Sequence, residues 1–288
     1  MLKRVYIFIS VFSMSALLMS CGAPKKDIED QNNGVIEEER LDIMDNNTLT
    51  KDLLPSEDVA KADVIDVTEE RAGINIKDLA AGVVVEAFLL EDISLGELFY
   101  ALPIDDNIKS RINGKSYGED CDVPYEELSY IRVLHKNFKG NTQIGEMIVN
   151  ESIADDMVAI FEELYKGDYP IERMVLVDEY EADDELSMEA NNSSAFNFRF
   201  IDGTTKRSSH SDGLAIDINP LYNPYVRTID GKTVVLPENG SSYADRELDN
   251  PYYIRKDDLC YKAFTRRGFT WGGEWKSSKD YQHFQKSE

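Results

Sequence analysis

The chain has 288 residues and a formal net charge of −24, with 55 acidic residues against 31 basic ones. Phosphate backbones bind clustered lysine and arginine side chains, so this acidic excess argues against a nucleic-acid partner. The length allows one substantial domain plus an additional segment.

The N-terminus has the layout of a secretory signal peptide. Basic residues precede an apolar run over residues 5–19, which is shorter than the roughly 20 apolar residues that a membrane-spanning helix needs. The segment that ends at Cys21 also resembles a bacterial lipobox, although Met19 is an unusual choice there. We therefore expect residues 1–20 to be a lipoprotein signal peptide and Cys21 to carry the lipid. A plain signal peptide with an incidental cysteine is the alternative.

Residues 21–80 are expected to form a flexible acidic tether. They are rich in aspartate, glutamate and asparagine, and no helical or strand period persists. Ordering such a segment would bury too little apolar surface to offset the lost conformational entropy. A weakly helical extension between residues 53 and 67 is the alternative. The folded domain is then expected at residues 81–288.

The first part of this domain is expected to contain short elements that serve packing. Regular structure begins with the apolar residues 82–90, and Ser94 is a candidate cap for a short helix. Residues 108–112 and a turn at 113–115 close this part.

The middle of the chain predicts a sheet with a helix packed on it. A strand-like stretch over residues 125–134, a turn at 137–140 and a second strand over 145–149 come first. Apolar residues at helical spacing then predict an amphipathic helix over 153–166. A further strand is expected over 171–177.

Several polar features of this part are assigned no chemistry. The acidic loop at residues 178–185 lacks the glycine and the alternating ligands of a calcium loop, so we interpret it as a solvated charge run. His135 belongs to no motif and is interpreted as structural. Cys121 and Cys260 are as compatible with a disulfide as with two free thiols.

A candidate metal-binding cluster begins at Ser208. Apolar and other residues alternate over 214–218, which predicts a strand with Asp217 on its non-aliphatic face. Gly213 allows a bend that would bring His210, from the preceding loop, to the same side as Asp217. An imidazole nitrogen and a carboxylate oxygen are suitable zinc ligands.

A second cluster near the C-terminus contains Asp280 and His283. Residues three apart on a straight strand point to opposite faces, so a bend must place Asp280 just before the strand that carries His283. The chain has only three histidines, and two of them lie in these clusters. His210, Asp217 and His283 would fill three zinc positions and leave a fourth for water. Asp280 is the candidate general base, and Glu274 is its rival.

These motifs resemble the zinc D-alanyl-D-alanine carboxypeptidase family, the VanY-like group, whose relatives include phage L-alanyl-D-glutamate endolysins and the Hedgehog signalling domain. Residues 208–217 match the family pattern S-x-H-x-x-G-x-A-x-D in full. Asp280 and His283 match the D-x-x-H element of the endolysin-like branch, where other branches carry Glu. Further similarity lies at residues 194–199, 219–224 and 271–273, so the resemblance covers roughly residue 82 to the end.

The resemblance implies both a fold and a metal centre. The implied fold is α+β, with a small, mostly antiparallel sheet flanked by helices and a zinc site in a surface groove, as in Hedgehog and related peptidases. It implies that His210, Asp217 and His283 bind Zn²⁺ and that Asp280 is the catalytic acid and base.

Arg199 and Ser208 are the remaining site residues that the resemblance implies. The Arg199 guanidinium would stabilise the developing oxyanion or hold a substrate carboxylate, and Ser208 would contact substrate. A salt bridge between Arg199 and the acidic loop is the alternative.

The sequence therefore predicts a monomeric zinc metallopeptidase that removes the terminal D-alanine from peptidoglycan stem peptides. It would act outside the cytoplasm, anchored to the bacterial membrane through Cys21. An endopeptidase that cuts between L-Ala and D-Glu uses the same metal chemistry, and a non-catalytic wall-binding lipoprotein is a further alternative. The loop over residues 221–251 is expected to border the groove and to set substrate choice.

Overall fold

The computed structural model describes residues 74–201 and 204–287. The predicted signal peptide, Cys21 and the predicted tether up to residue 73 lie outside the described residues. The first described element is the 3₁₀ helix η1 (Ile76–Asp78), whose Ile76 side chain is buried in the core. Within the part that the structure describes, no helix is both long enough and apolar enough to cross a membrane.

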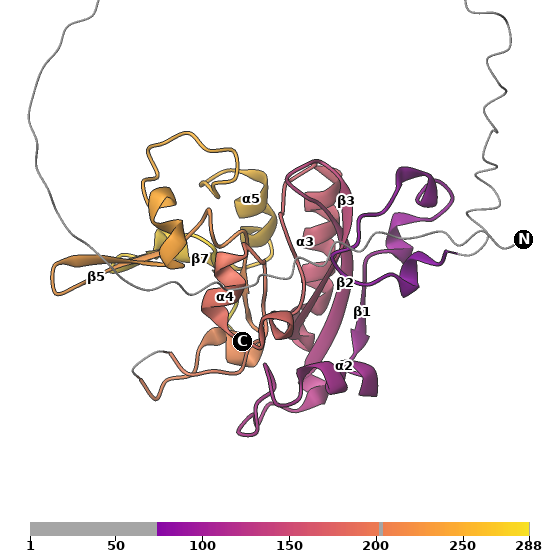
Figure 1. Ribbon diagram of the computed structural model, residues 1–288, viewed down its shortest axis with the longest axis horizontal. Helices are drawn as coiled ribbons and strands as arrows, with labels where there is room; N and C mark the ends of the chain where they lie inside the picture. Colours follow the sequence, from indigo (N-terminus) through magenta and orange to yellow (C-terminus); the bar gives the residue numbers. More distant parts are fainter. Residues whose placement is uncertain (1–73, 202–203, 288) are drawn as a thin grey trace, which may run out of the picture. The chain divides into compact units, whose positions relative to one another are not determined.

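A three-stranded antiparallel sheet in the order β1-β2-β3 organises the N-terminal half of the fold (Figure 1). The nine-residue strands β2 (Leu128–Lys136) and β3 (Thr142–Asn150) pair along their whole length, and the predicted turn joins them. The short strand β1 (Tyr100–Pro103) pairs with the other edge of β2. Both strands predicted for residues 125–149 are therefore present, although the first begins only at Leu128, because the preceding residues form the 3₁₀ helix η4 (Tyr125–Glu127).

Two helices pack on this sheet, and the longer one was predicted. Helix α3 (Ala154–Lys166) buries Met157, Ile160, Phe161 and Leu164, which recur at helical spacing, and lies beside β2 and β3 in Figure 1. Burial of each such side chain stabilises the fold by about 1.5–3 kcal/mol relative to its exposed state. Helix α2 (Asp106–Ile112) begins where Asp105 accepts a hydrogen bond from the Ile108 amide.

The short helix expected after Ser94 is only a single 3₁₀ turn. This turn is η3 (Leu95–Glu97), and the Ser94 side chain makes no capping hydrogen bond to it. Tyr100, six residues after Ser94, begins β1 and pairs opposite Arg132. Pairing with β2 thus takes the place of a longer helix.

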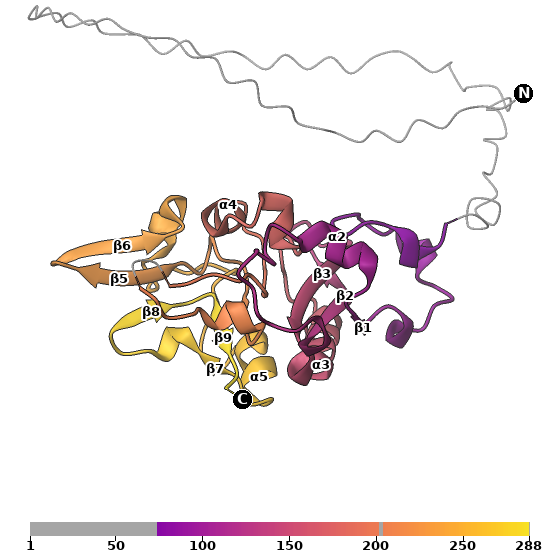
Figure 2. The same cartoon turned by 90° about the horizontal axis from the view of Figure 1, so that it is seen from below.

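The C-terminal half contains two further three-stranded antiparallel sheets, which Figure 2 shows from below. One has the order β4-β9-β7, with bounds β4 (Ala215–Asp217), β9 (His283–Gln285) and β7 (Thr270–Trp271). The other has the order β6-β5-β8, with bounds β6 (Lys232–Leu236), β5 (Tyr225–Ile229) and β8 (Ser278–Asp280). Helix α5 (Leu259–Thr265) covers the first of these sheets, and its Phe264 ring stacks on Phe284 of β9 at 4.2 Å.

The predicted α+β class is confirmed, but the β-structure is divided among three small sheets rather than one. The segment 221–251, which we expected to be a loop, contains the β5–β6 hairpin. Short strands form here because each new segment pairs for only two to five residues before a bend redirects the chain.

The strand predicted over residues 171–177 is wrong, although the segment crosses the edge of β3. Two of its amide groups bind side chains where a neighbouring strand would supply carbonyl oxygens. The Glu172 amide donates to Asn219 Oδ1 at 3.0 Å, and the Val175 amide donates to Asn192 Oδ1 at 2.9 Å. Hydrogen bonds to asparagine side chains thus take the place of the strand-to-strand hydrogen bonds that the aliphatic pattern predicted.

The acidic loop is only partly the solvated charge run that we expected. Asp178 is 4% exposed and accepts hydrogen bonds from the amide and the hydroxyl of Ser116, both at 3.0 Å. The loop also contains the 3₁₀ helix η6 (Val177–Tyr180) and the start of helix α4 (Asp184–Glu189). Its charges therefore help to fix the local fold.

The two cysteines of the described residues are both free thiols. Cys121 is half-buried and Cys260 is buried. Burial raises the pKa of the Cys260 thiol well above its usual range, which leaves it unreactive. The open question of a disulfide is thus answered in favour of free thiols.

Candidate metal centre

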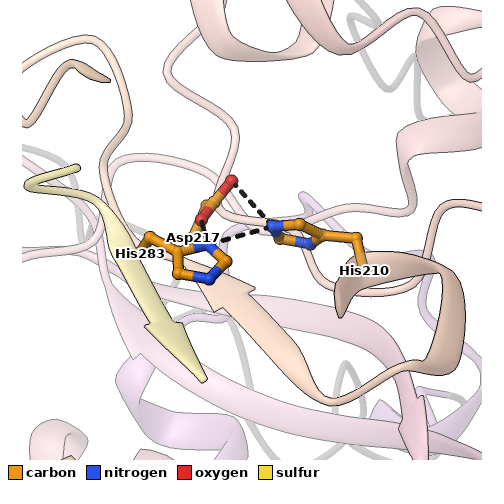
Figure 3. A group of neighbouring side chains, drawn as sticks. All are labelled: His210, Asp217 and His283. Carbon is orange, nitrogen blue, oxygen red and sulfur yellow. Dashed lines mark hydrogen bonds and ion pairs between the residues drawn. The ribbon is translucent and has the colours of Figure 1, made fainter. Parts of the chain in front are cut away.

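Three side chains from the two sequence motifs converge on one point (Figure 3). His210 Nε2 lies 3.3 Å from Asp217 Oδ2 and 3.3 Å from His283 Nδ1. His283 Nδ1 lies 3.1 Å from Asp217 Oδ1. All three residues are buried. The structure thus brings together the three residues that the sequence predicted as metal ligands.

Local backbone geometry explains this convergence. The 3₁₀ helix η7 (Ser209–Asp212) presents His210 and ends at Gly213, whose φ of +68° turns the chain into β4. A Cβ atom at Gly213 would lie 2.5 Å from the backbone nitrogen of Asn150, so no larger residue fits. Strand β4 pairs with β9 in a register that sets Asp217 directly opposite His283. The predicted bend at the glycine is therefore confirmed.

Each imidazole is oriented by an oxygen that can only accept a hydrogen bond. His210 Nδ1 donates to the Ala195 carbonyl at 2.7 Å, and His283 Nε2 donates to Gln285 Oε1 at 3.0 Å. These donations fix the tautomers, so the lone pairs of the other two ring nitrogens face the shared point. Metal-binding histidines are held in this way.

The separation of these atoms fits a zinc ion. A tetrahedral Zn²⁺ with ligand bonds of about 2.0–2.1 Å keeps its ligand atoms about 3.3 Å apart. The three closest separations here are 3.1, 3.3 and 3.3 Å. Two imidazole nitrogens and one carboxylate are also a donor set that suits zinc. His210, Asp217 and His283 would therefore hold the ion.

Charge coupling inside the cluster is strong because all three groups are buried. Burial alone would raise the pKa of Asp217, but His210 and His283 hold it well below its usual range. Burial would lower the pKa of His283, but Asp217 opposes it and raises the pKa to about 9. A metal ion would therefore compete with a proton for the His283 nitrogen.

Asp280 lies beside this cluster, at the end of β8, and its carboxylate interacts electrostatically with all three residues. Asp280 is the last residue of β8 and does not itself lie in the predicted bend, which comes after it at residues 281–282, before β9 begins. Burial raises the pKa of Asp280 to about 7. Its Oδ1 is buried and has no hydrogen-bond partner among the described residues. A carboxylate oxygen is thus free to exchange a proton beside the metal-binding point.

The backbone of Gly272 packs closely against Asp280. A Cβ atom at Gly272 would lie 2.6 Å from the Asp280 carbonyl oxygen and 2.8 Å from its Cβ. The glycine turn that follows Trp271 is therefore needed to admit the strand that carries the candidate base.

The other predicted site residues have different contacts. Arg199 forms an ion pair with Asp184 of the acidic loop, which was the alternative interpretation of this residue. Ser208 accepts a hydrogen bond from the His210 amide at 3.3 Å and so caps η7. Substrate roles for Arg199 and Ser208 stay predictions.

Glu274, the rival base, has its carboxylate in a separate interaction. Its Oε1 lies 2.9 Å from Lys256 Nζ and accepts from the Tyr261 hydroxyl at 3.2 Å. Lys256 lowers the pKa of Glu274, so this carboxylate is a poorer proton acceptor. Asp280 therefore stays the candidate base.

Sequence reasoning missed the groups that support the cluster. The Ala195 carbonyl carries no sequence signal, because any residue supplies one. Gln285 does carry one, since it follows His283 by two residues on a strand and therefore shares its face. Trp275 was also missed; its ring lies 5.3 Å from that of His283 and covers one side of it.

Comparison with known proteins places the site within a matched region. A family model described as D-alanyl-D-alanine carboxypeptidase matches residues 202–286, which include the three candidate ligands and Asp280. This match confirms the resemblance seen in the sequence. No curated protein and no solved structure gives a match to the chain. At the level of the family, the match supports a peptidoglycan-related metallopeptidase.

Proposed function

We propose that the chain is a zinc-dependent D-alanyl-D-alanine carboxypeptidase that trims peptidoglycan stem peptides. The observation that carries this proposal is the convergence of His210, Asp217 and His283 next to a buried, unpartnered Asp280 oxygen. The family match over the same residues supports the reaction type.

Each residue of the site has a separate proposed role in amide hydrolysis. When bound, Zn²⁺ supplies a Lewis acid that polarises the scissile carbonyl and acidifies water. Asp280 Oδ1 takes the proton from the attacking water and delivers it to the leaving amine. Ala195 and Gln285 keep both imidazoles in the tautomer that faces the reaction centre. Because these groups are buried, the charges act at low dielectric and stabilise the transition state more strongly.

Arg199 is the proposed contact for the substrate carboxylate. Its side chain is 36% exposed, so a ligand can reach it. In the structure the guanidinium is paired with Asp184, and binding a substrate carboxylate requires exchange of this partner. The exchange would replace one ion pair by another, which keeps its net cost small.

Location supports stem peptides as the substrate. The expected signal peptide and the lipid on Cys21 would hold the enzyme at the outer side of the membrane, where stem peptides are found. An L-alanyl-D-glutamate endopeptidase would use the same residues, so product identity must separate the two activities.

Digestion of purified pentapeptide muropeptides tests the proposal. We expect the zinc-loaded protein to release one terminal alanine, detected as a single mass loss, and a chelator to abolish the reaction. Cleavage inside the stem would instead identify an endopeptidase. Absence of any cleavage by the zinc-loaded protein would favour a non-catalytic wall-binding protein.

Exchange of Asp280→Asn tests the assigned base. We expect kcat to fall about 10²–10⁴-fold, the usual contribution of a positioned general base, while the bound zinc per chain stays the same. Glu274→Gln is the matched control and should keep its activity, because Glu274 is held by Lys256. Equal activity of Asp280→Asn and wild type would show that the base is another group.

A further inference from the structure

We propose that a groove on the N-terminal sheet, separate from the metal centre, binds a peptide that carries both carboxylate and ammonium groups. The identity of the peptide rests on the proposed function, under which it is a second stem peptide of the wall. The enzyme would then contact the wall at two points.

The groove crosses one face of the β1-β2-β3 sheet. Its volume is about 1270 Å³, larger than the ~300–1,000 Å³ of typical small-ligand pockets, so it has room for a peptide. Residues of helix α2 and of the segment 77–82 are among those that line it. Tyr130, Arg132 and Glu146 form its floor on β2 and β3. None of the three candidate metal ligands lines it.

The floor of the groove carries buried charges where an ordinary sheet face would be apolar. Glu146 is 2% exposed and accepts hydrogen bonds from Arg111 at 2.6 and 2.8 Å and from the Tyr130 hydroxyl at 2.8 Å. Arg132 is 9% exposed, and its Nη2 donates to the carbonyls of Ile76 and Leu79. Apolar residues of similar size would often stabilise the fold as well or better. The floor of the groove is therefore a polar base held by contacts within the chain, which leaves the exposed charged side chains of the rim to contact a ligand.

The charge balance of the groove differs from that of the chain. Five basic and five acidic side chains line the groove, whereas the chain has 31 basic and 55 acidic residues. Such a surface has no net charge to attract a polyanion, but it complements a ligand with charges of both signs. Among the rim residues, Lys77 and Arg173 are exposed, and Arg173 Nη1 donates to the Tyr180 hydroxyl at 3.0 Å. A guanidinium at the rim suits a peptide carboxylate.

A hydrogen bond joins the rim of the groove to the segment that follows β4, the strand of the candidate ligand Asp217. The Glu172 amide donates to Asn219 Oδ1 at 3.0 Å, and Glu172 Oε2 accepts from Asn191 Nδ2 at 2.7 Å. Asn219 follows the candidate ligand Asp217 by two residues. A peptide held in the groove is therefore held in a fixed relation to the metal centre. This relation suits a crosslinked substrate that presents several stems.

Titration calorimetry of the zinc-loaded Asp280→Asn chain with a soluble pentapeptide muropeptide tests the proposal. We expect two binding sites per chain, one at the metal centre and one in the groove. Arg173→Glu should weaken one class of site by about tenfold or more, because it sets a carboxylate against the peptide carboxylate. Lys262→Glu, the same charge change on the exposed side of α5, is the matched control and should leave both classes intact.

The outcomes separate this inference from the proposed function. Unchanged binding at both sites in Arg173→Glu and in the double variant Lys77→Glu/Arg173→Glu would overturn the groove assignment. Arg173 is exposed, so its exchange is not expected to unfold the protein. If the wild type hydrolyses the muropeptide but calorimetry finds only one binding site, the groove proposal is rejected and the carboxypeptidase proposal stands. If calorimetry finds two binding sites but the wild type hydrolyses no muropeptide, the carboxypeptidase proposal is rejected and the groove proposal stands.

Discussion

At the scale of single residues, the candidate metal centre depends on groups other than its three candidate ligands. His283 shares its strand with Gln285, and the carboxamide oxygen of Gln285 decides which ring nitrogen faces the cluster. Ser209 Oγ donates to the same oxygen at 3.3 Å and so helps to hold it in place. Hydrogen bonds from Ser209 to Gln285 and from His283 to Gln285 therefore fix the orientation of the His283 ring.

Gln285→Leu should weaken zinc binding by about 10–100-fold, the usual effect of losing such a support. The leucine has a similar size but no acceptor, so the imidazole of His283 loses its preferred tautomer. Gln285→Glu is the control, because it keeps an acceptor oxygen for His283 Nε2. Competition with a metallochromic chelator measures both affinities. Equal affinity of Gln285→Leu and wild type would show that the tautomer is fixed by another group.

His135 is the one histidine of the chain outside the motifs, and it predicts a pH-dependent stability. Burial lowers its pKa to about 4, while its Nδ1 donates to the Ile171 carbonyl at 2.8 Å. The unfolded chain protonates His135 near its ordinary pKa of about 6.5. Above pH 6.5, His135 is neutral in both the folded and the unfolded chain and does not change the free energy of unfolding. As the pH falls from about 6.5 towards 4, only the unfolded chain takes up the proton, so the free energy of unfolding decreases. The full effect is on the order of 3 kcal/mol.

Exchange of His135→Asn tests this dependence. Asparagine keeps a donor near the position of Nδ1 but does not titrate, so we expect a flatter loss of stability between pH 6.5 and 4. Urea unfolding of both proteins at several pH values gives the difference in unfolding free energy. An identical pH dependence of the two proteins would show that His135 is already accessible to protons in the fold.

At the scale of elements, the sequence predicted those features that depend on neighbours along the chain. Helix α3 and the β2–β3 hairpin followed from apolar periodicity, and the bend at Gly213 followed from its conformational freedom. The missing strand at 171–177 depends on Asn192 and Asn219, which lie far along the chain. The pairing of Asp217 with His283 across two strands required the family resemblance for the same reason.

Gly213→Ala should disrupt the turn that joins η7 to β4. The residue has φ +68°, and a Cβ atom would lie 2.5 and 3.0 Å from backbone atoms of Asn150 and Val149. Neither neighbour can move away as a flexible side chain would. We expect a loss of at least about 2 kcal/mol in unfolding free energy, together with weaker zinc binding.

Gly231→Ala is the matched control for this turn. Gly231 has a similar φ of +76°, but a Cβ atom added there would meet no atom within 4 Å. Its exchange measures only the cost of the left-handed backbone, about 1–2 kcal/mol. Similar losses for both variants, with unchanged zinc affinity, would show that the contact between Gly213 and Asn150 is unimportant.

At the scale of the whole molecule, the matched family region is only part of the described fold. The match begins at residue 202, whereas the β1-β2-β3 sheet and α3 precede it. The two parts share one continuous core, because α3 packs in the same cluster as Phe264 and Phe284. The strands that carry the candidate ligands therefore pack on an N-terminal layer that lies outside the matched region. If the proposed groove binds a stem peptide, this layer would provide a second contact with the wall.

Zinc should stabilise the whole fold, because its candidate ligands lie 73 residues apart at the extremes and come together only when the chain is folded. A ligand that binds the native state alone stabilises it by about 2.7 kcal/mol at 100 times its Kd. For a domain of this size, that corresponds to a rise in Tm of roughly 5–10 °C. Differential scanning calorimetry with zinc, with magnesium and with a chelator measures the shift.

Magnesium is the control ion, because it prefers all-oxygen ligands and should have little effect on Tm. His283→Ala should remove the response to zinc; if the variant keeps the full shift, the stabilising ion binds elsewhere.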